Sequence, residues 1–393
     1  MKKNLFITLL AALFSINYCY AQDSFDKTVE YLLNQNYDII VSYEENELEL
    51  NELKSDNNLP ETEVSFSRRW GNKDGQKTGV EISQGFDWPG LYAARSRQHS
   101  LTKEAISFLQ KSRILDKKNE IRLLLIDYIA AKQKVELAKE VYGNMNKLVE
   151  KYRRAYEAGE VSIIDRNKVI VETARAKAAL MTAEHEREDV VAAILAQGKD
   201  NSVMPMLADL TRYPDLILYP EEEYEDMINN QDPMLEYYRR MDNVAAQQQK
   251  VAKLGYMPSF SVGYGYEYEE GQAFHGFNVG IGLPIFSNRH KTKSAHLSRL
   301  VNENNLNAEK LRQITKMRNM VADVKLMDGT IDTFRDLFEN QNQLSLLKKA
   351  FDGGEINLFT YLADMNYFTE ARAGYIDAQY TRAKLLVELN KLK

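Results

Sequence analysis

Two stretches of this chain, "YEAGEVSIIDRNK" (156–168) and "FDGGEINLFTYLA" (351–363), decide its fold. Each sets a glycine and a glutamate between two long helical patterns, and the glycines, Gly159 and Gly354, are 195 residues apart. Glycine readily takes the left-handed conformation in which helices end. We therefore expect each glycine to close a descending helix. The glutamate after it is expected at the start of a returning helix, where negative charge is favourable.

The same shift of 195 residues superimposes other landmarks of the chain. The motif "LLNQNYDI" meets "MINNQDPM", and "DWPGLYAARSR" meets "GLPIFSNRHKT", so that Pro89 falls on Pro284. From these prolines to the two glycines the halves align without a gap. The sequence therefore predicts two copies of one structural unit, a first repeat at 22–217 and a second at 218–393.

Each repeat contains the same predicted elements in the same order. They are a first helix (roughly 23–56 and 221–254), a β-hairpin (62–86 and 258–283), a long helix (about 91–158 and 288–352), a tip at the glycine, and a return helix (about 162–197 and 356–391). A helix of about 65 residues is roughly 100 Å long, which no single globular core accommodates. Apolar residues recur every seven positions at Val141, Leu148 and Ala155, which is typical of a coiled coil.

The predicted strands alternate strictly between two kinds of residue. In the second hairpin Val262, Tyr264 and Tyr266 alternate with Gly263 and Gly265. Such alternation predicts strands with one apolar face and one polar or small face. Aromatic residues at alternate positions occur both in transmembrane barrels with a water-filled lumen and in ordinary β-sandwiches. The predicted strands are close in length to the 9–11 residues that cross a bilayer, and this length favours the transmembrane barrel.

Four strands cannot close a barrel with a channel inside. In lipid their open edges would leave backbone groups without hydrogen bonds, at several kcal/mol each. Several copies must therefore pool their strands, and three copies supply twelve. The predicted fold is mainly α with a small β part: long coiled-coil helical hairpins and two-stranded β-hairpins, duplicated, with the strands of a trimer forming a 12-stranded barrel over a helical tunnel.

The first 21 residues have the order of a secretory signal peptide. Two lysines precede an apolar core too short to span a bilayer, and cleavage is expected before Gln22. Cys19, the only cysteine, leaves with this peptide or is a lipidation site, for which its neighbours Asn17 and Tyr18 fit poorly. Loss of the two lysines takes the formal charge from −6 to −8, and an acidic chain without a basic run argues against nucleic acid.

The sequence contains no constellation of catalytic residues, so we expect no enzyme and no cofactor. His290 and His296 are six residues apart, which places them on different faces of a helix, and the run Glu184-His185-Glu186 is typical of a solvated helix face. We therefore expect no metal site.

These features, in this order and in duplicate, resemble the TolC-like outer-membrane efflux channels. The "PGLYAARSR" and "LPIFSNRHK" junctions are similar to the family's passage from barrel strand to long helix. The stretches "YRRAYEAGEVSIIDRNKV" and "LKKAFDGGEINLFTYLADM" resemble its two periplasmic tip motifs, and "LLNQNYDI" and "MINNQDPM" its N-terminal helices. The resemblance covers essentially all of the mature chain.

The resemblance implies a homotrimer in the bacterial outer membrane that extends into the periplasm. It also implies that the tips dock a periplasmic adaptor (membrane fusion) protein, itself bound to an inner-membrane pump of the RND type. The strand-to-helix sequence is most similar to the branch that serves heavy-metal or general cation pumps, with drug efflux as the alternative.

The resemblance further assigns roles to individual residues. The expected adaptor-docking tips are Gly159, Glu160, Ser162, Gly354, Glu355 and Asn357, the possible gate is Asp165 and Asp364, and the strand-to-helix junctions are Pro89, Arg95, Pro284 and Arg289. The gate departs from the family pattern, because Thr360 and Ala363 occupy the positions where aspartates are expected, and Asp364 comes one residue late. These acidic residues ring the aperture or are solvated first-turn charges.

Basic residues follow the strands in matching places of both repeats. Arg95, Arg97, Arg289, Lys291 and Lys293 either contact lipid headgroups or are ordinary polar-face residues. The function expected from the whole sequence is a passive conduit for small molecules or metal cations in a tripartite efflux system. The alternative is a periplasmic coiled-coil adaptor or scaffold without a channel.

Overall fold

The structure, a computed structural model of the chain, describes residues 24–70, 76–285, 290–338 and 343–393. The predicted signal peptide with Cys19, and Arg289, lie outside the described residues. The chain divides into two compact units. The sheet unit is Val41–Arg113 with Ile228–Gln313, and the helical unit is Met1–Ile40 with Ile114–Met227 and Ile314–Lys393. Each unit draws on both halves of the chain, so the predicted repeats at 22–217 and 218–393 remain a hypothesis about the sequence.

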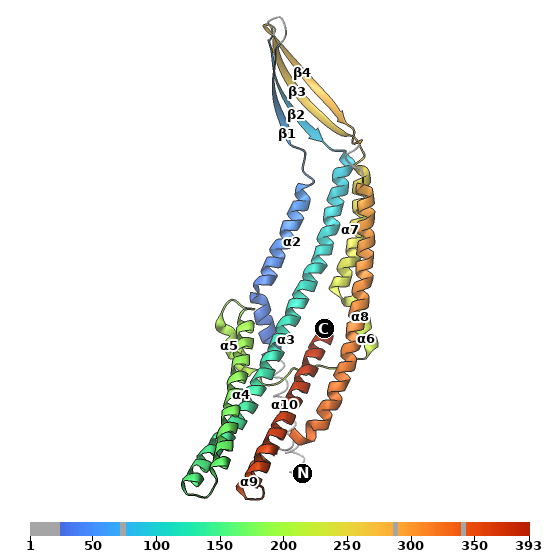
Figure 1. Cartoon of the computed structure of the whole chain (residues 1–393). Coiled ribbons are helices and arrows are strands. Elements are labelled where there is room, and N and C mark those ends of the chain that lie inside the picture. Colours follow the sequence, from blue (N-terminus) through green and yellow to red (C-terminus); the bar gives the residue numbers. More distant parts are fainter. Residues whose placement is uncertain (1–23, 71–75, 286–289, 339–342) are drawn as a thin grey trace, which may run out of the picture. The chain divides into compact units, whose positions relative to one another are not determined.

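The sheet unit contains one antiparallel sheet of four strands in the order β1-β2-β3-β4. The strands are β1 (Thr62–Trp70), β2 (Gln76–Phe86), β3 (Ser259–Glu269) and β4 (Gln272–Gly282) (Figure 1). Residues Glu270 and Gly271 connect β3 to β4 with φ of 44° and 84°. Two central residues with positive φ are the signature of the tight hairpin turn whose twist matches that of the strands.

Long helices make up the rest of the sheet unit, and all of them except α7 continue into the helical unit. They are α2 (Tyr37–Ser55), α3 (Pro89–Glu157), α7 (Pro233–Leu254) and α8 (Lys291–Phe338). Within the sheet unit, α2 is tied to α3 by Gln110, whose amide donates to Ser42 at 2.9 Å and accepts from Asn46 at 2.6 Å. Gln247 of α7 donates to the carbonyl of Ala94 on α3 at 3.0 Å.

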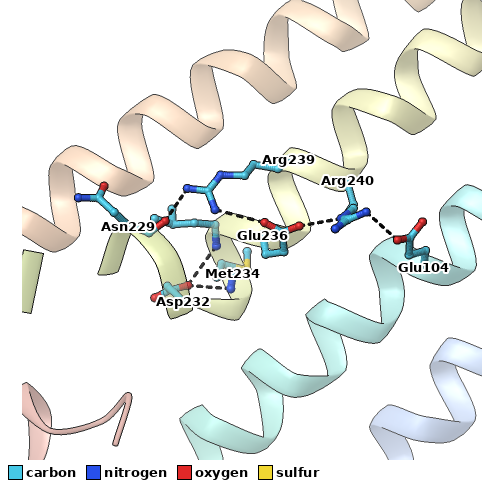
Figure 2. Close-up of polar contacts among 8 residues, drawn as sticks. Glu104, Asn229, Asp232, Met234, Glu236, Arg239 and Arg240 are labelled. Atoms are coloured by element: carbon cyan, nitrogen blue, oxygen red, sulfur yellow. Dashed lines mark hydrogen bonds and ion pairs between the residues drawn. The ribbon is translucent and has the colours of Figure 1, made fainter. Parts of the chain in front are cut away.

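The first helix predicted in each half is two helices. Residues 24–35 are separated from α2 by Asn36, and α6 (Glu221–Gln231) is separated from α7 by Asp232. Asn36 Oδ1 accepts from two backbone amides of α2, and Asp232 Oδ1 accepts from Met234 N at 2.7 Å and from Leu235 N at 3.0 Å (Figure 2). Side-chain oxygens of this kind replace the missing helical bonds at a new N-terminus, which explains why the single helices predicted at 23–56 and 221–254 are wrong.

The helical unit is built from two antiparallel helix pairs. The remaining helices are α4 (Ile163–Leu195), a 3₁₀ turn (Asn201–Val203), α5 (Met204–Asp209), α9 (Gln343–Asp352) and α10 (Leu358–Leu389). One core packs α3 against α4, α9 and α10, and its centre includes Met145, Val169 and Tyr361. A second core, to which α3 contributes Ile126 and Ile129, joins α3 to α4, α5 and α10.

The predicted combination of long helical hairpins with a small four-stranded sheet is confirmed. The long helix α3 starts at Pro89, two residues earlier than expected, because proline is well suited to the first helical position. The second long helix is described as α8 and α9, and residues 339–342 between them lie outside the described residues. The short helix α5 and the turn before it were not predicted.

Candidate functional site: the apolar sheet face, the helical tips and the strand-to-helix junction

The strand register places most of the large apolar residues of the four strands on one face of the sheet. Val64 of β1 pairs with Ile82, which pairs with Tyr264, which pairs with Phe277. The next row is apolar in the second hairpin, with Val262 opposite Val279, and polar in the first, with Thr62 opposite Gln84. Because alternate residues of a strand share a face, these rows give the sheet one mainly apolar face.

This apolar face is exposed in the single chain. Phe277 is 81% exposed and Val279 is 76% exposed, and at least nine other large apolar side chains on this side of the sheet are also exposed. They are Val64, Phe66, Val80, Ile82, Val262, Tyr264, Tyr266, Ile281 and Leu283. Soluble monomers rarely expose contiguous apolar patches of this kind, which mark contact with protein or membrane. The alternation predicted from the sequence is therefore present, and its apolar half is exposed to solvent in the single chain.

The opposite face of the sheet is mostly small and polar, with Phe274, opposite Glu267, as a large apolar exception. Glu81 accepts from the amide of Asn278 at 2.8 Å, although the two residues are 197 positions apart in the chain. Lys77 lies 2.8 Å from Glu267 and 3.5 Å from Glu269. These contacts cross from β2 to β3 and β4, so the polar face joins the two hairpins.

Glycines on the polar face of β4 lie opposite serines of β3. A Cβ added at Gly280 would lie 2.5 Å from the hydroxyl oxygen of Ser261, and one at Gly282 would lie equally close to that of Ser259. The glycine row thus leaves room for the serine row.

The two tips of the helical unit have the same hydrogen-bond geometry. Gly159 has φ of 78°, and Glu160 N donates to the carbonyl of Ala155 at 2.8 Å. In the second tip Gly354 has φ of 80°, and Glu355 N donates to the carbonyl of Ala350 at 3.0 Å. A left-handed glycine with a bond back over the last turn is the usual way in which a helix ends.

The returning helices also begin alike. Ser162 accepts from Asp165 N at 3.1 Å, and Asn357 accepts from Thr360 N at 2.9 Å. These caps place the helix starts at Ile163 and at Leu358. The expectation that Glu160 and Glu355 lie at the start of the returning helices is therefore wrong, because each precedes its cap by two residues.

The predicted gate residues have different surroundings in the helical unit. Asp165 lies in the first turn of α4, where its carboxylate accepts from the Ser162 hydroxyl at 2.8 Å. Asp364 is half-buried on α10, beside the buried Met365. The first arrangement is that of a local helix cap.

Each tip also exposes a large apolar side chain, at an equivalent position, that the sequence analysis did not single out. Ile164 is 64% exposed and Phe359 is 74% exposed. Both are the second residue of a returning helix, and they are again 195 residues apart. The alignment of the two halves shows that an apolar residue occurs at this position in both repeats. The exposure of the two side chains could not be predicted in this way, because it depends on how the helices pack.

Contacts between α3 and α9 hold the two tips together. Lys151 of α3 lies 3.6 Å from Asp352 of α9 and 5.2 Å from the centre of the Phe351 ring, which stacks on Tyr361. A hydrogen bond from Lys348 at 2.6 Å lowers the pKa of the Asp352 carboxyl.

An ion-pair network in the sheet unit crosses from α3 to α7 (Figure 2). Arg240 lies 2.7 Å from both Glu104 and Glu236, and Arg239 lies 3.2 Å from Glu236. Arg239 also donates to the carbonyl of Asn229 at the end of α6 at 2.7 Å. Burial acts to raise the pKa of Glu236, but the hydrogen bonds from the two arginines outweigh it, and the pKa is lowered. The sequence analysis missed this network, because ion pairing depends on which helix faces lie together.

The junction between strands and helices contains three of the residues expected there. Pro89 begins α3, Arg95 lies on its second turn, and Pro284 follows β4. Arg95 lies 2.8 Å from Asp87, so its charge is paired. The remaining junction residue, Arg289, is outside the described residues.

Neither a metal centre nor a membrane-spanning helix is found in the described residues. No group of three or more His, Cys, Asp or Glu side chains there could hold a metal ion. Every helix described is too short or too polar to cross a membrane.

No protein-family model matches the chain, and no curated protein sequence matches it. Solved structures do match. A membrane protein from Pseudomonas aeruginosa is 13% identical, with a TM-score of 0.72 over 94% of this chain and 90% of that chain. The CmeC outer membrane channel of Campylobacter jejuni is 15% identical, with a TM-score of 0.71 over 94% of this chain and 85% of that chain. The open state of the MtrE outer membrane channel of Neisseria gonorrhoeae is 15% identical, with a TM-score of 0.69 over 94% and 88%. The chain therefore has the fold of the TolC-like outer-membrane efflux channels.

Proposed function

We propose that this protein is the outer-membrane channel of a tripartite efflux system. The observation that carries the proposal is the exposed apolar face of the four-stranded sheet, on a chain whose fold matches outer membrane channels. Strands that are apolar on one face and small or polar on the other are suited to a barrel with lipid outside and water inside.

The channel is a homotrimer. In the single chain β1 and β4 are the two edges of the sheet, so each pairs on one side only. An unpaired edge in lipid costs several kcal/mol for each backbone group, and pairing of β4 with β1 of the next copy removes every edge. Three copies form a twelve-stranded barrel in the outer membrane, and their long helices form the tunnel that extends into the periplasm.

The tips of the helical unit dock a periplasmic adaptor protein, which is bound to an inner-membrane pump of the RND type. Support comes from the two equivalent turns at Gly159 and Gly354, and from their exposed neighbours Glu160, Ser162, Glu355 and Asn357. Asp165 and Asp364 are the candidates for the gate. Because a wide aqueous lumen contacts solutes weakly, the pump selects the small molecule or metal cation, and the channel is a passive conduit without enzymatic activity.

The experiment that tests this function is fractionation of cell membranes followed by mass determination of the detergent-solubilised protein. We expect the protein in the outer-membrane fraction with the mass of a trimer. A soluble periplasmic monomer would reject the channel and leave an adaptor or scaffold.

A second measurement tests the role in efflux. Deletion of the gene should sensitise cells to the exported compound, and the intact chain should restore resistance. If deletion changes the intracellular level of neither metal cations nor drugs, a conduit for export is contradicted.

A further inference from the structure

A cavity of about 410 Å³ lies in the sheet unit where the strands meet the helices. It is lined by the start of α3, the end of α7, the first residue of β3 and the last residue of β4. This volume is in the range of sites that bind small molecules. Every residue of the lining lies in the sheet unit, so the cavity belongs to one compact part of the chain.

The cavity has an excess of positive charge. Its charged lining residues are Arg95, Lys291 and Asp87. Asp87 accepts a hydrogen bond from Arg95 at 2.8 Å, which pairs that charge and fixes the position of the guanidinium. Lys291 is exposed, and none of the ion pairs among the described residues involves it. One net positive charge thus faces the cavity.

Two helices begin at this cavity and add to its positive potential. Pro89 is the first residue of α3 and Lys291 is the first residue of α8, and neither helix has an acidic residue in its first turn. The N-terminus of a helix carries a partial positive charge that favours anions. The two helix starts and the lysine favour the same ligand, a group with one or two negative charges.

The remaining lining combines apolar side chains with small residues of the polar sheet face. The apolar side chains include Trp88, Leu91, Met257 and Leu283, and the small residues are Ser259 and Gly282. Leu283 is 68% exposed. The ring of Trp88 lies 6.1 Å from that of Phe260, the first aromatic residue of the apolar row on β3. The apolar wall therefore continues onto the exposed apolar face of the sheet.

The indole of Trp88 lies close to Gly90 in this wall. A Cβ added at Gly90 would lie 3.1 Å from both Cδ1 and Nε1 of Trp88. The absence of a side chain at Gly90 leaves room for the ring at the start of α3. Tryptophan with one apolar and one polar edge is typical of the boundary between lipid and water.

We propose that this cavity binds an anionic phospholipid. Its phosphate lies at Lys291 and Arg95, and its acyl chains pass Trp88 and Leu283 onto the apolar face of the sheet. The inference rests on the proposed function, since it requires that face to lie in a membrane. A free phosphate ion has the same charge, but it leaves the apolar wall and the adjoining exposed face uncovered, and for this reason we assign a lipid.

The test uses the full chain purified in detergent and dihexanoyl phosphatidylglycerol, a water-soluble lipid, titrated with native mass spectrometry as the readout. We expect Lys291→Gln to weaken binding roughly tenfold, because it removes a charge-assisted hydrogen bond. Lys293→Gln is the matched control, since Lys293 is exposed on the same helix turn but does not line the cavity. It should leave the affinity unchanged. Trp88→Ala should weaken binding of the lipid and leave binding of inorganic phosphate unchanged.

Three results would overturn the lipid site. They are equal losses for Lys291→Gln and Lys293→Gln, equal affinity for dihexanoyl phosphatidylcholine, and displacement of the lipid by an equal concentration of inorganic phosphate. Because the probe is soluble in water, its binding is measured without a membrane. A trimer in the outer membrane that binds no lipid here rejects only this inference, whereas a soluble monomer rejects the proposed function.

Discussion

Gly159 and Gly354 end two different helices with the same left-handed backbone, at φ of 78° and 80°. A Cβ added at either glycine would meet no atom within 4 Å. Space around these positions is therefore free, and the requirement for glycine comes from the backbone alone. Residues with a Cβ are strained in this conformation, and asparagine least among them.

Substitution of the tip glycines should destabilise the tips by an amount that depends on the new side chain. We expect Gly159→Ala or Gly354→Ala to cost about 1 kcal/mol, with a smaller loss for asparagine and a larger loss for valine. Hydrogen exchange of the tip amides measures this locally. Equal exchange in the alanine and asparagine variants would contradict the backbone explanation.

The double variant Gly159→Val with Gly354→Val should also impair assembly with the adaptor, because both docking turns are distorted. Pull-down of the adaptor and efflux from cells measure the effect. Gly143→Val is a matched control, since a Cβ at Gly143 also meets no atom within 4 Å and its backbone is helical. Unchanged efflux in the tip variant counts against docking at the tips.

The two faces of β4 should respond oppositely to a new charge. Val279→Lys places a cation on the apolar face, where it should cost about 2–4 kcal/mol if that face is at the middle of a bilayer. Asn278→Lys places the same charge on the polar face and should be tolerated. The yield of folded trimer in the outer membrane is the measurement. Equal yields would show that the apolar face is not in lipid.

The exposed apolar residues of the tips should matter for docking and not for folding. Ile164→Ser and Phe359→Ser remove side chains that are exposed in the single chain, so we expect the free energy of unfolding to change by less than about 0.5 kcal/mol. Binding of the adaptor should weaken roughly tenfold or more if these residues are buried in the interface. Val171→Ser is the control, since Val171 is exposed on α4 away from the tip. A loss of the same size in the control would argue against docking through these two residues.

The network around Glu236 should make stability depend on pH. The pKa of Glu236 is lower in the folded chain than its usual value. Its contribution is therefore fully present above the usual pKa of glutamate and is lost as the pH falls through the lowered value. We expect Glu236→Gln to cost about 1 kcal/mol at neutral pH and to cost little in acid.

The measurement for this network is denaturant unfolding of the detergent-solubilised protein over the acid range. Glu47→Gln is the control, because Glu47 is exposed on α2 in the same unit and its substitution removes the same charge. A difference between Glu236→Gln and the original chain that persists unchanged in acid would contradict the ion-pair explanation.

Features with a local cause could be predicted from the sequence. The left-handed turns at Gly159 and Gly354 follow from glycine itself, and the two faces of the strands follow from the period of two in residues such as Val262 and Tyr264. The break at Asp232 also has a local signal, since aspartate before proline is typical of a helix start. Because the residues on both sides of Asp232 have a helical pattern, the sequence analysis predicted one continuous helix, and that prediction was wrong.

The sequence by itself therefore determined the repeated turns, the long helices and the existence of strands with an apolar face. Only the tertiary structure decided that β2 pairs with β3, that Ile164 and Phe359 remain exposed, and that Lys291 and Trp88 share a cavity. The physical reason is the range of the interactions. A turn or a strand pattern depends on neighbours along the chain, whereas burial, ion pairing and cavities depend on contacts between segments that are distant in the sequence.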